Sequence, residues 1–461
     1  MPFDNAAALD RALFHAREYL LHLDTTPVAP TASLECLRKR LVKPLAQGGL
    51  PAEQVIDELV ADSAGGIMGC AGGRFFAWVV GGALPAALGA DWLAAAWDQN
   101  AGIHASGPAA AVVEEAAGAW LKDLLNISSE ASFAFVTGCN MAHVTCLAAA
   151  RHRLLADRGW DVEERGLCGA PPIRIVTGNS RHGSFVRAAR LVGLGKGSMV
   201  NLSVDEEERL RPETLEAELA RNASAPTIVL LQAGELCTGA FDAFADLIPI
   251  ARRYGAWVHI DGAFGLWAAA SPRFRDYLNG SELADSWATD GHKWLNVPYD
   301  CGYAFVKDRA SHQAAMSHRE SYLIHDAEAR DQMDWNPEWS RRARGFPTYA
   351  ALRQLGRSGV AEVVERCCDC ARALVLGIGS LPGAEVVWEP RINQGLVGFT
   401  DQDPNAVIAA VNASGEAYFG ATTWRGRRVM RVSVSNWMTG EAEVARVIGA
   451  VREVLLTGRS I

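Results

Sequence analysis

The strongest constraint on the fold is a repeated alternation between residues 110 and 310, where short apolar runs are followed by amphipathic segments. Such runs are typical of buried parallel strands, and the segments between them have the apolar spacing of helices. The pattern predicts an α/β domain with a mostly parallel sheet. The predicted strands cover residues 133–138, 173–178, 199–204, 226–234, 256–265, 284–291 and 302–308.

The regions on either side have different patterns. Residues 1–75 have helical spacing interrupted by Pro and Gly, whereas the last part of the chain mixes helical segments with strand-like runs at 384–390, 394–400 and 428–437. We therefore predict three parts: an N-terminal helical segment (1–75), a large α/β domain (76–350) and a small C-terminal α+β domain (351–461).

Composition limits the functional classes. The 461 residues are 49% hydrophobic and 21% charged, and their formal net charge is −9. This acidic balance argues against a nucleic-acid partner, because phosphate binding needs a basic face. The N-terminus lacks an export-type apolar segment and the 10 cysteines show no disulfide spacing, so we expect a cytoplasmic protein. The longest uncharged run, 75–90, is short and broken by Gly and Pro, so we expect no membrane segment.

Three features fall at the ends of predicted strands, where parallel sheets bind ligands. Gly138 permits a tight turn into a helix beginning near Asn140, whose free N–H groups suit a phosphate. Asp261 follows the buried run "AWVHI" and needs a cationic or hydrogen-bonding partner. Lys293 lies in apolar surroundings that are expected to lower its pKa and make it an amine nucleophile. Taken singly, these features also fit a plain turn, a helix cap and a lysine that reaches solvent.

Together the three features fit one ligand, pyridoxal 5′-phosphate, which needs a phosphate site, a carboxylate at its ring nitrogen and a lysine for a Schiff base. The stretch from "HIDGAFG" to "DGHKWLNVPYDCGYAFV" resembles the group II pyridoxal-phosphate-dependent decarboxylases, which include aromatic amino acid, glutamate, histidine and tyrosine decarboxylases. The resemblance is strongest from about residue 134 to residue 350. It implies a fold-type I, aspartate aminotransferase-like α/β structure with a mostly parallel seven-stranded sheet.

Matching motifs imply roles for single residues. Lys293 would form the internal aldimine with the cofactor, and Asp261 would pair with the ring nitrogen. His182, in "NSRHGSFVRAAR", would stack on the ring, and Tyr322, in "SYL", would donate a proton from a mobile loop. The other cofactor contacts implied by the resemblance are Gly138, Cys139, Asn140, Ala263 and His292.

The implied reaction is decarboxylation of an L-amino acid to its amine and CO2 through a quinonoid intermediate. Two other outcomes on the same scaffold stay open: an oxidative deaminase that forms an aldehyde, and a carbon–carbon lyase. Tyr322 and His182 favour decarboxylation, because aldehyde-forming relatives often carry Phe or Asn at these positions. A protein that holds the cofactor without activity is a further alternative. No metal is expected, although Cys139, His143 and Cys146 share a helical face.

The substrate prediction depends on the segment "RFFAWVVGG" (74–82), which aligns roughly with the family's side-chain pocket. Phe76, Trp78 and Val79 would make this pocket apolar and favour an aromatic or large aliphatic amino acid. The same residues also fit a buried core or a subunit interface. The resemblance further implies a homodimer in which residues 1–75 extend across the partner.

The chain departs from the family at two places. Glu235 and Leu236 stand where many members have threonine near the cofactor, and Asp290 and Gly291 stand where Asn-Pro is common. Glu235 either faces the cofactor, adding a negative charge, or faces away as a loop residue. These departures bear on the substrate and the outcome of the reaction rather than on the cofactor.

Overall fold

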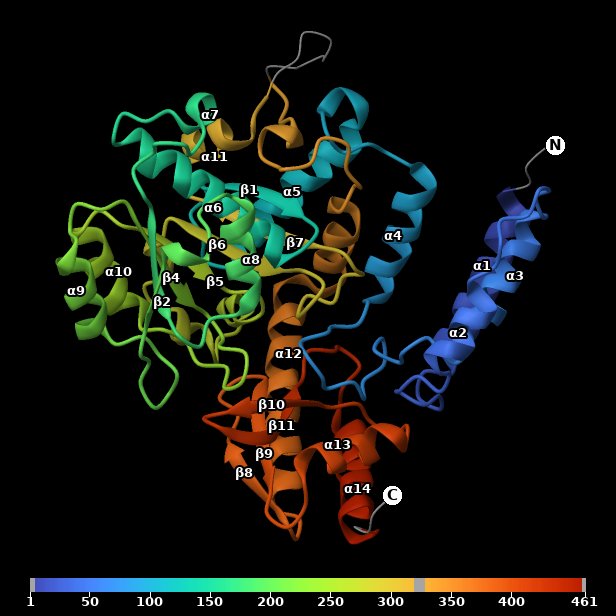
Figure 1. The fold of residues 1–461 in the computed structure, drawn as a ribbon. Coiled ribbons are helices and arrows are strands. Elements are labelled where there is room, and N and C mark those ends of the chain that lie inside the picture. Colours follow the sequence, from blue (N-terminus) through green and yellow to red (C-terminus); the bar gives the residue numbers. More distant parts are fainter. Residues whose placement is uncertain (1–4, 319–327, 458–461) are drawn as a thin grey trace.

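A seven-stranded sheet forms the centre of the computed structural model, which describes residues 5–318 and 328–457 (Figure 1). Its strand order is β1-β7-β6-β5-β4-β2-β3. All seven predicted strands of the large domain are confirmed. They are β1 (Ser132–Val136), β2 (Arg174–Gly178), β3 (Met199–Leu202), β4 (Thr227–Gln232), β5 (Trp257–Asp261), β6 (Ser286–Asp290) and β7 (Gly302–Val306).

The sheet is mixed, because β7 runs antiparallel to both of its neighbours, β1 and β6. The pairs β2–β3, β2–β4, β4–β5 and β5–β6 are parallel. In the centre, Asp261 pairs in register with Gln232 on one side and Ala288 on the other. The carboxyl ends of β4, β5 and β6 therefore meet at one edge of the sheet.

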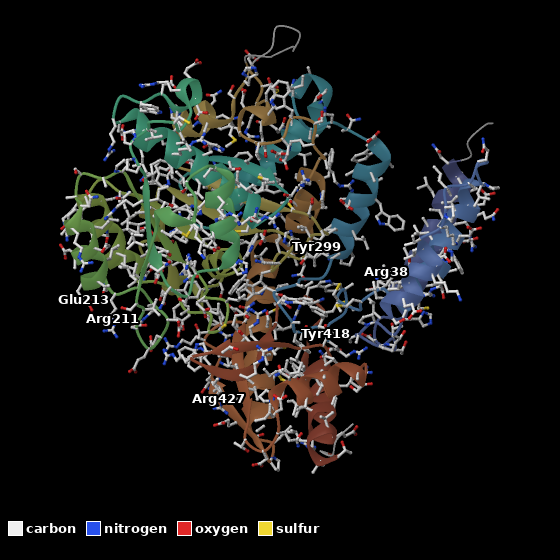
Figure 2. All side chains as sticks on the ribbon, in the orientation of Figure 1. Arg38, Arg211, Glu213, Tyr299, Tyr418 and Arg427 are labelled. Atoms are coloured by element: carbon white, nitrogen blue, oxygen red, sulfur yellow. The ribbon has the colours of Figure 1, made fainter. Side chains whose placement is uncertain are left out.

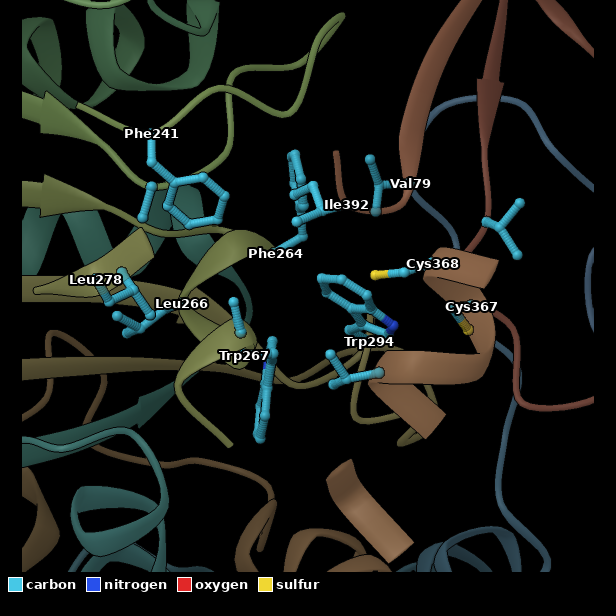
Figure 3. Close-up of a cluster of buried hydrophobic side chains, with 14 of the residues drawn as sticks. Val79, Phe241, Phe264, Leu266, Trp267, Leu278, Trp294, Cys367, Cys368 and Ile392 are labelled. Carbon is cyan, nitrogen blue, oxygen red and sulfur yellow. The ribbon is translucent and has the colours of Figure 1, made fainter. Parts of the chain in front are cut away.

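Both faces of the sheet are buried, as the apolar runs predict. Along β1, Phe133 and Phe135 belong to one hydrophobic cluster, whereas Ala134 and Val136 belong to another, because successive side chains of a strand point to opposite faces. Figure 3 shows part of the first cluster, where Trp294 lies beside Cys367 and Cys368 of helix α12 (Gly345–Gly379). The covering helices are α5 (Pro108–Leu124), α6 (Cys139–Ala156), α7 (Val162–Arg165), α8 (Gly183–Leu191), α9 (Pro212–Arg221), α10 (Phe244–Arg253) and α11 (Arg309–Met316).

The C-terminal part contains an antiparallel sheet of order β10-β11-β9-β8, packed beside helices. Its elements are β8 (Ala384–Trp388), β9 (Gln394–Phe399), α13 (Pro404–Ala413), β10 (Gly420–Trp424), β11 (Arg427–Ser433) and α14 (Glu441–Thr457). The long helix α12 (Gly345–Gly379) links it to the large domain and is kinked at Gly356, whose φ is 60°. The predicted boundary between residues 350 and 351 falls inside α12.

The N-terminal helices α1 (Asn5–Leu21), α2 (Leu34–Leu41) and α3 (Ala52–Ser63) form an arm that stands apart from the body in Figure 1. Inside the arm, Asp57 of α3 lies 2.6 Å from His15 of α1 and also pairs with Arg11. On the outside, Leu9 and Leu21 of α1 are 58% and 71% exposed. The arm thus presents apolar side chains that nothing within this chain covers among the described residues.

The remaining elements are α4 (Pro85–Trp97) and the short 3-10 helices η1 (His104–Ser106), η2 (Lys196–Ser198), η3 (Gly265–Ala270), η4 (Arg275–Leu278), η5 (Ser281–Leu283) and η6 (Gln332–Asp334). An apolar hollow separates α1 from α4, lined by Leu13 and Leu20 on one side and Leu88 and Trp92 on the other. Within the described part of the chain, no helix combines the length and the apolar character needed to cross a bilayer.

Candidate active site

Asp261 ends the central strand β5 and is buried, with 7% of its surface exposed. The N–H of Ala263 donates to its Oδ1 at 3.2 Å, and Nε2 of His143 lies 3.4 Å from its Oδ2. Burial acts to raise the pKa of Asp261, but its interactions with His143, His182 and Lys293 outweigh that effect, and the pKa lies below its usual range. The site therefore contains a buried carboxylate that stays ionised.

Lys293 follows β6 and pairs with the residue that ends that strand: its Nζ lies 2.9 Å from Oδ2 of Asp290. Burial acts to lower the pKa of Lys293, but nearby negative charges, led by Asp290, outweigh it and the pKa is raised. The expectation that apolar surroundings lower this pKa is therefore wrong, because the acidic partner stands only three residues away. Backbone packing fixes the lysine loop, since a Cβ on Gly81 would lie 1.9 Å from the Lys293 carbonyl oxygen.

The predicted phosphate turn lies beside this pair. Gly138 precedes α6, and the first N–H of that helix, from Cys139, donates to Oδ1 of Asp290 at 2.5 Å. The turn needs glycines, because a Cβ on Gly302 would lie 2.5 Å from Cα of Gly138. The N-terminus of α6 is thus an anion site, and in this structure the carboxylate of Asp290 binds there.

The other predicted contacts surround the same turn. Asn140 lies in the first turn of α6, half-buried. The Nδ1 atom of His292 accepts the N–H of Cys301 at 3.1 Å, and its Nε2 lies 3.5 Å from Oδ1 of Asp290. Its ring stacks on that of Tyr299; the position of Tyr299 is labelled in Figure 2. The Nε2 edge of His292 therefore faces the anion site, as a phosphate contact requires.

His182 is the N-cap of α8, where its Nδ1 accepts the N–H of Ser184 at 3.2 Å. Desolvation lowers the pKa of His182, the charge of Asp261 opposes this effect, and the charge of Lys293 adds to it. The side chain of His182 is exposed to solvent within this chain, although the charges of Asp261 and Lys293 act on its pKa. Tyr322, the predicted proton donor, lies outside the described residues.

The three residues predicted to line the substrate pocket separate in the structure. Phe76 is fully buried and stacks on Phe419 at 5.3 Å between ring centroids, and Val79 lies in the core cluster of Figure 3. Trp78 is 56% exposed and has a φ of 54°. Within this chain, only Trp78 of the three presents its side chain to solvent, so the pocket prediction now depends on it.

Glu235 folds back onto its own loop. Its Oε2 accepts the N–H groups of Cys237 and Thr238, each at 2.8 Å, and the hydroxyl of Thr238 at 2.9 Å. Burial raises its pKa. Of the two roles considered for Glu235, the structure supports the loop-capping one.

Sequence reasoning did not identify two other groups at this edge. His259 lies two residues before Asp261 on the same face of β5, and its Nε2 is 2.9 Å from Nδ1 of His143. Arg431 of β11 is buried beside the Glu235 loop and donates to the Leu236 carbonyl at 3.3 Å. The spacing in "HID" was the available signal for His259; no local signal marks Arg431, because it comes from the C-terminal domain.

The metal alternative based on Cys139, His143 and Cys146 does not assemble. Sγ of Cys146 lies against the carbonyl groups of Trp287 and Phe305, on the sheet side of α6. Cys139 and His143 instead meet Asp261, with their donor atoms within 4.8 Å of one another.

A lysine and an ionised carboxylate at neighbouring strand ends, next to a helix N-terminus, define a site of the pyridoxal-phosphate type. Residues 41–401 match the family model described as the pyridoxal-dependent decarboxylase conserved domain. The chain belongs to this family, and its cofactor is pyridoxal 5′-phosphate.

Relatives of the chain have several activities. It is 26% identical to tryptophan decarboxylase 1 of Oryza sativa subsp. japonica, over 96% of this chain and 91% of that protein. It is 24% identical to phenylacetaldehyde synthase of Arabidopsis thaliana, over 95% of this chain and 92% of that protein. It is 28% identical to an acidic amino acid decarboxylase of Mus musculus, over 69% of this chain and 58% of that protein.

Solved structures confirm the fold. The structure of the Oryza sativa enzyme TDC with PLP and tryptamine has a TM-score of 0.92 at 22% identity, covering 100% of both chains. That of 4-hydroxyphenylacetaldehyde synthase of Rhodiola rosea has a TM-score of 0.87 at 21% identity, also covering 100% of both chains. At these identities the likeness shows the architecture, not the substrate.

The side chains around the site fit the cofactor, with one departure. Asp261 could hold the ring nitrogen, Lys293 carries the amine that the cofactor needs, and the N-terminus of α6 could bind the phosphate. The departure is Asp290. Its carboxylate already accepts the N–H of Cys139, and its negative charge opposes the binding of a phosphate at the same place. Cofactor loading must therefore work against this carboxylate.

Replacing Asp290 with Asn is expected to tighten cofactor binding about tenfold, because a like charge is removed from the phosphate site. It is also expected to speed covalent attachment near neutral pH. Asp290 raises the pKa of Lys293. Without its charge that pKa falls, so more of the lysine is present as the free amine at a given pH. Fluorescence titration of the apoprotein and stopped-flow absorbance would measure the two effects.

Asp308→Asn is the matched control for this experiment. Asp308 caps α11, where its Oδ1 accepts the N–H of Ser311 at 3.1 Å, so the control also removes a carboxylate from a helix N-terminus. Its cofactor affinity should match that of the wild type. Equal or weaker binding by Asp290→Asn would show that Asp290 does not compete with the phosphate.

Proposed function

We propose that the protein decarboxylates an L-amino acid, aromatic or large and apolar, to the corresponding amine and CO2. The observation that carries the proposal is the placement of Lys293 and the ionised Asp261 at the ends of adjacent strands, beside the N-terminus of α6. The likeness to tryptophan decarboxylase 1 over 96% of the chain supports the aromatic class.

The roles of the residues follow from their chemistry. When bound, pyridoxal 5′-phosphate supplies the electron sink for the bond that breaks. Lys293 holds the cofactor through its Nζ and takes it back after each turnover. Asp261 would stabilise a proton on the ring nitrogen, and His182, at the start of α8, would contact the ring. Tyr322 is the proposed donor of the proton to Cα.

An aldehyde-forming reaction is the second candidate. Phenylacetaldehyde synthase of Arabidopsis thaliana matches 95% of the chain at 24% identity, about as well as the decarboxylases do. We propose simple decarboxylation rather than aldehyde formation because the chain has Tyr322 and His182 at the two positions where aldehyde-forming relatives often carry Phe or Asn.

A substrate panel tests both levels of the proposal. Purified protein loaded with cofactor would be offered tryptophan, tyrosine, phenylalanine, glutamate and diaminobutyrate, and CO2, amine, aldehyde and hydrogen peroxide would be measured for each. We expect amine and CO2 in equal amounts, with kcat/KM at least about tenfold higher for an aromatic substrate than for glutamate. Aldehyde and peroxide in place of amine would overturn the decarboxylase proposal. Equal or better turnover of glutamate or diaminobutyrate would overturn the substrate class.

We also propose that the N-terminal arm (residues 5–63) packs on a second copy of the chain to form a homodimer. The apolar hollow between α1 and α4 is the surface that a partner would fill. Replacing Leu13 and Leu20 together with Glu should weaken the dimer at least about a hundredfold, because two charges would be buried without partners. Sedimentation velocity over a range of concentrations measures this effect.

The control for the dimer experiment is Glu18→Gln, on the same helix but outside the residues that line the hollow. It should sediment as the wild type does. A wild-type protein that stays monomeric at micromolar concentration would contradict the dimer.

A further inference from the structure

Behind Asp261 lies a continuous line of buried polar side chains that the proposed reaction does not use. It runs from Asp261 to His143 of α6, His259 of β5, Ser286 of β6 and Trp257 of β5. The two histidines and Ser286 are fully buried. Buried polar groups are costly unless they are paired, so the connections of this line need an explanation.

Three of the four contacts along the line are short. Nδ1 of His143 lies 2.9 Å from Nε2 of His259, and Nδ1 of His259 lies 2.9 Å from Oγ of Ser286. Nε1 of Trp257 donates to the same Oγ at 2.9 Å. The line ends at Nε2 of His143, which is 3.4 Å from Oδ2 of Asp261. Each atom with hydrogen-bonding capacity on the two rings therefore has a partner.

Aromatic packing fixes both imidazole rings in place. Phe185 of α8 meets the ring of His143 edge-on at 5.4 Å and stacks on the ring of His259 at 5.8 Å. The sulfur of Cys139 lies 3.4 Å from Nε2 of His143 and 3.9 Å from Oδ1 of Asp261. The histidine next to Asp261 is thus held by three elements, α6, α8 and β5.

The direction of the hydrogen bonds follows from the charge of Asp261. An ionised carboxylate only accepts, so the neighbouring Nε2 of His143 carries hydrogen. The opposite polarity would set a nitrogen lone pair against the carboxylate. Burial lowers the pKa of His259 to about 3, so this ring is neutral and carries one hydrogen.

The rest of the assignment follows when His143 also carries one hydrogen. Its Nδ1 then accepts from Nε2–H of His259, and Nδ1 of His259 accepts from the hydroxyl of Ser286. The oxygen of Ser286 in turn accepts from Nε1–H of Trp257. All donors in the line point toward Asp261, and no buried atom on the two rings is left unpaired.

We propose that His143 is a positioning residue for the cofactor. Held by His259, Ser286 and Trp257, it donates Nε2–H to Asp261 and keeps that carboxylate charged opposite the ring nitrogen. The inference depends on the assignment of Asp261 to the ring nitrogen, which belongs to the proposed function. It adds that three further buried residues determine how strongly Asp261 holds a proton on that nitrogen.

The measurement is the protonation of the ring nitrogen itself. Holoprotein would be prepared with cofactor labelled with ¹⁵N in the ring, and the ¹⁵N chemical shift would be followed against pH. His143→Phe keeps a ring of similar volume and removes the donor, so the apparent pKa of the ring nitrogen should fall by about one to two units. His143→Gln, which can place an N–H where Nε2 stood, should restore most of the wild-type value.

Other ionisable groups lie around Asp261, and they must be the same in the wild type and in the His143 variants whose titrations are compared. They are Cys139 of α6, His182 at the start of α8, His259 of β5 and Lys293 after β6. The matched control is His312→Phe. His312 is another fully buried histidine, outside this line, and is bonded to Oγ of Ser132 at 2.8 Å and to the Trp335 carbonyl at 2.9 Å. This control should lose stability but keep the wild-type ¹⁵N titration.

Asp261→Asn separates the two levels of the argument. If Asp261→Asn shifts the ¹⁵N titration and His143→Phe does not, the inference about His143 is overturned and the cofactor assignment stands. If Asp261→Asn leaves the titration unchanged, the assignment of Asp261 itself is wrong. Should the His143 variants fail to fold, the variant Ser286→Ala is used instead. A smaller fall in the apparent pKa of the ring nitrogen would support the line of hydrogen bonds, and an unchanged titration would overturn it.

Discussion

Lys293→Ala is expected to lower kcat at least about a thousandfold, because the amine that holds the cofactor and returns it after each turnover is lost. Covalent attachment should also disappear. Reduction of the holoprotein with borohydride and intact-mass measurement should find one cofactor per wild-type chain and none on the variant. Proteolysis of the reduced wild-type protein should place the modification on Lys293.

Lys122→Ala is the control for that variant, because Lys122 is also a buried lysine. Its Nζ donates to the carbonyl groups of Ser129 and Ala131, away from the site, and burial lowers its pKa. The Lys122 variant should lose stability yet keep the attached cofactor and the activity. A Lys293→Ala protein that still carries reduced cofactor on another lysine would contradict the assignment.

Asp261→Asn is expected to lower kcat/KM about 100- to 1000-fold, because the replacement keeps the shape and removes the charge opposite the ring nitrogen. Cofactor should still attach to Lys293, so borohydride labelling separates this loss from a loss of binding. Steady-state rates with the best substrate of the panel measure the effect. Activity within about threefold of the wild type would remove Asp261 from the reaction.

Asp285→Asn is the control at the other end of the same sheet. Asp285 precedes β6, its Oδ2 accepts the N–H of Val258 at 2.7 Å, and burial raises its pKa. The variant loses a half-buried carboxylate just before the neighbouring strand β6, without touching the site edge. It should change thermal stability and leave kcat/KM close to that of the wild type.

The strands of the large domain could be predicted because their signal is local. Most are short runs with both faces buried, as in β1, where Phe133 and Phe135 pack in one core and Ala134 and Val136 in the other. The edge strand β3 is only partly buried. The strand β10 was not predicted. It consists of "GATTW", whose residues are only partly buried, so the apolar pattern is weak there. The boundary at 350 fell inside α12 because the link between domains is a helix, which leaves no break in composition.

The site was predictable where chemistry coincided with a strand end. Asp261 and Lys293 follow buried runs, and a charged residue in that position needs a partner or a function. The contact between Cys139 and Asp290 joins residues 151 positions apart, and no spacing rule reaches that distance. The expectation of a lowered lysine pKa failed for a local reason, because Asp290, three residues before Lys293, forms an ion pair with it.

The sequence by itself determined the alternation of strands and helices, the glycine turn before α6, and the acid and the amine at two strand ends. These are local properties, because burial patterns, backbone freedom and residue chemistry depend on residues that lie within a few positions of one another in the sequence. Only the tertiary structure decided that Asp290 occupies the anion site, that Glu235 caps its own loop, and that His143 meets Asp261. These depend on how α6, β5 and β6 pack, since electrostatic effects follow distance and burial in space rather than order in the chain.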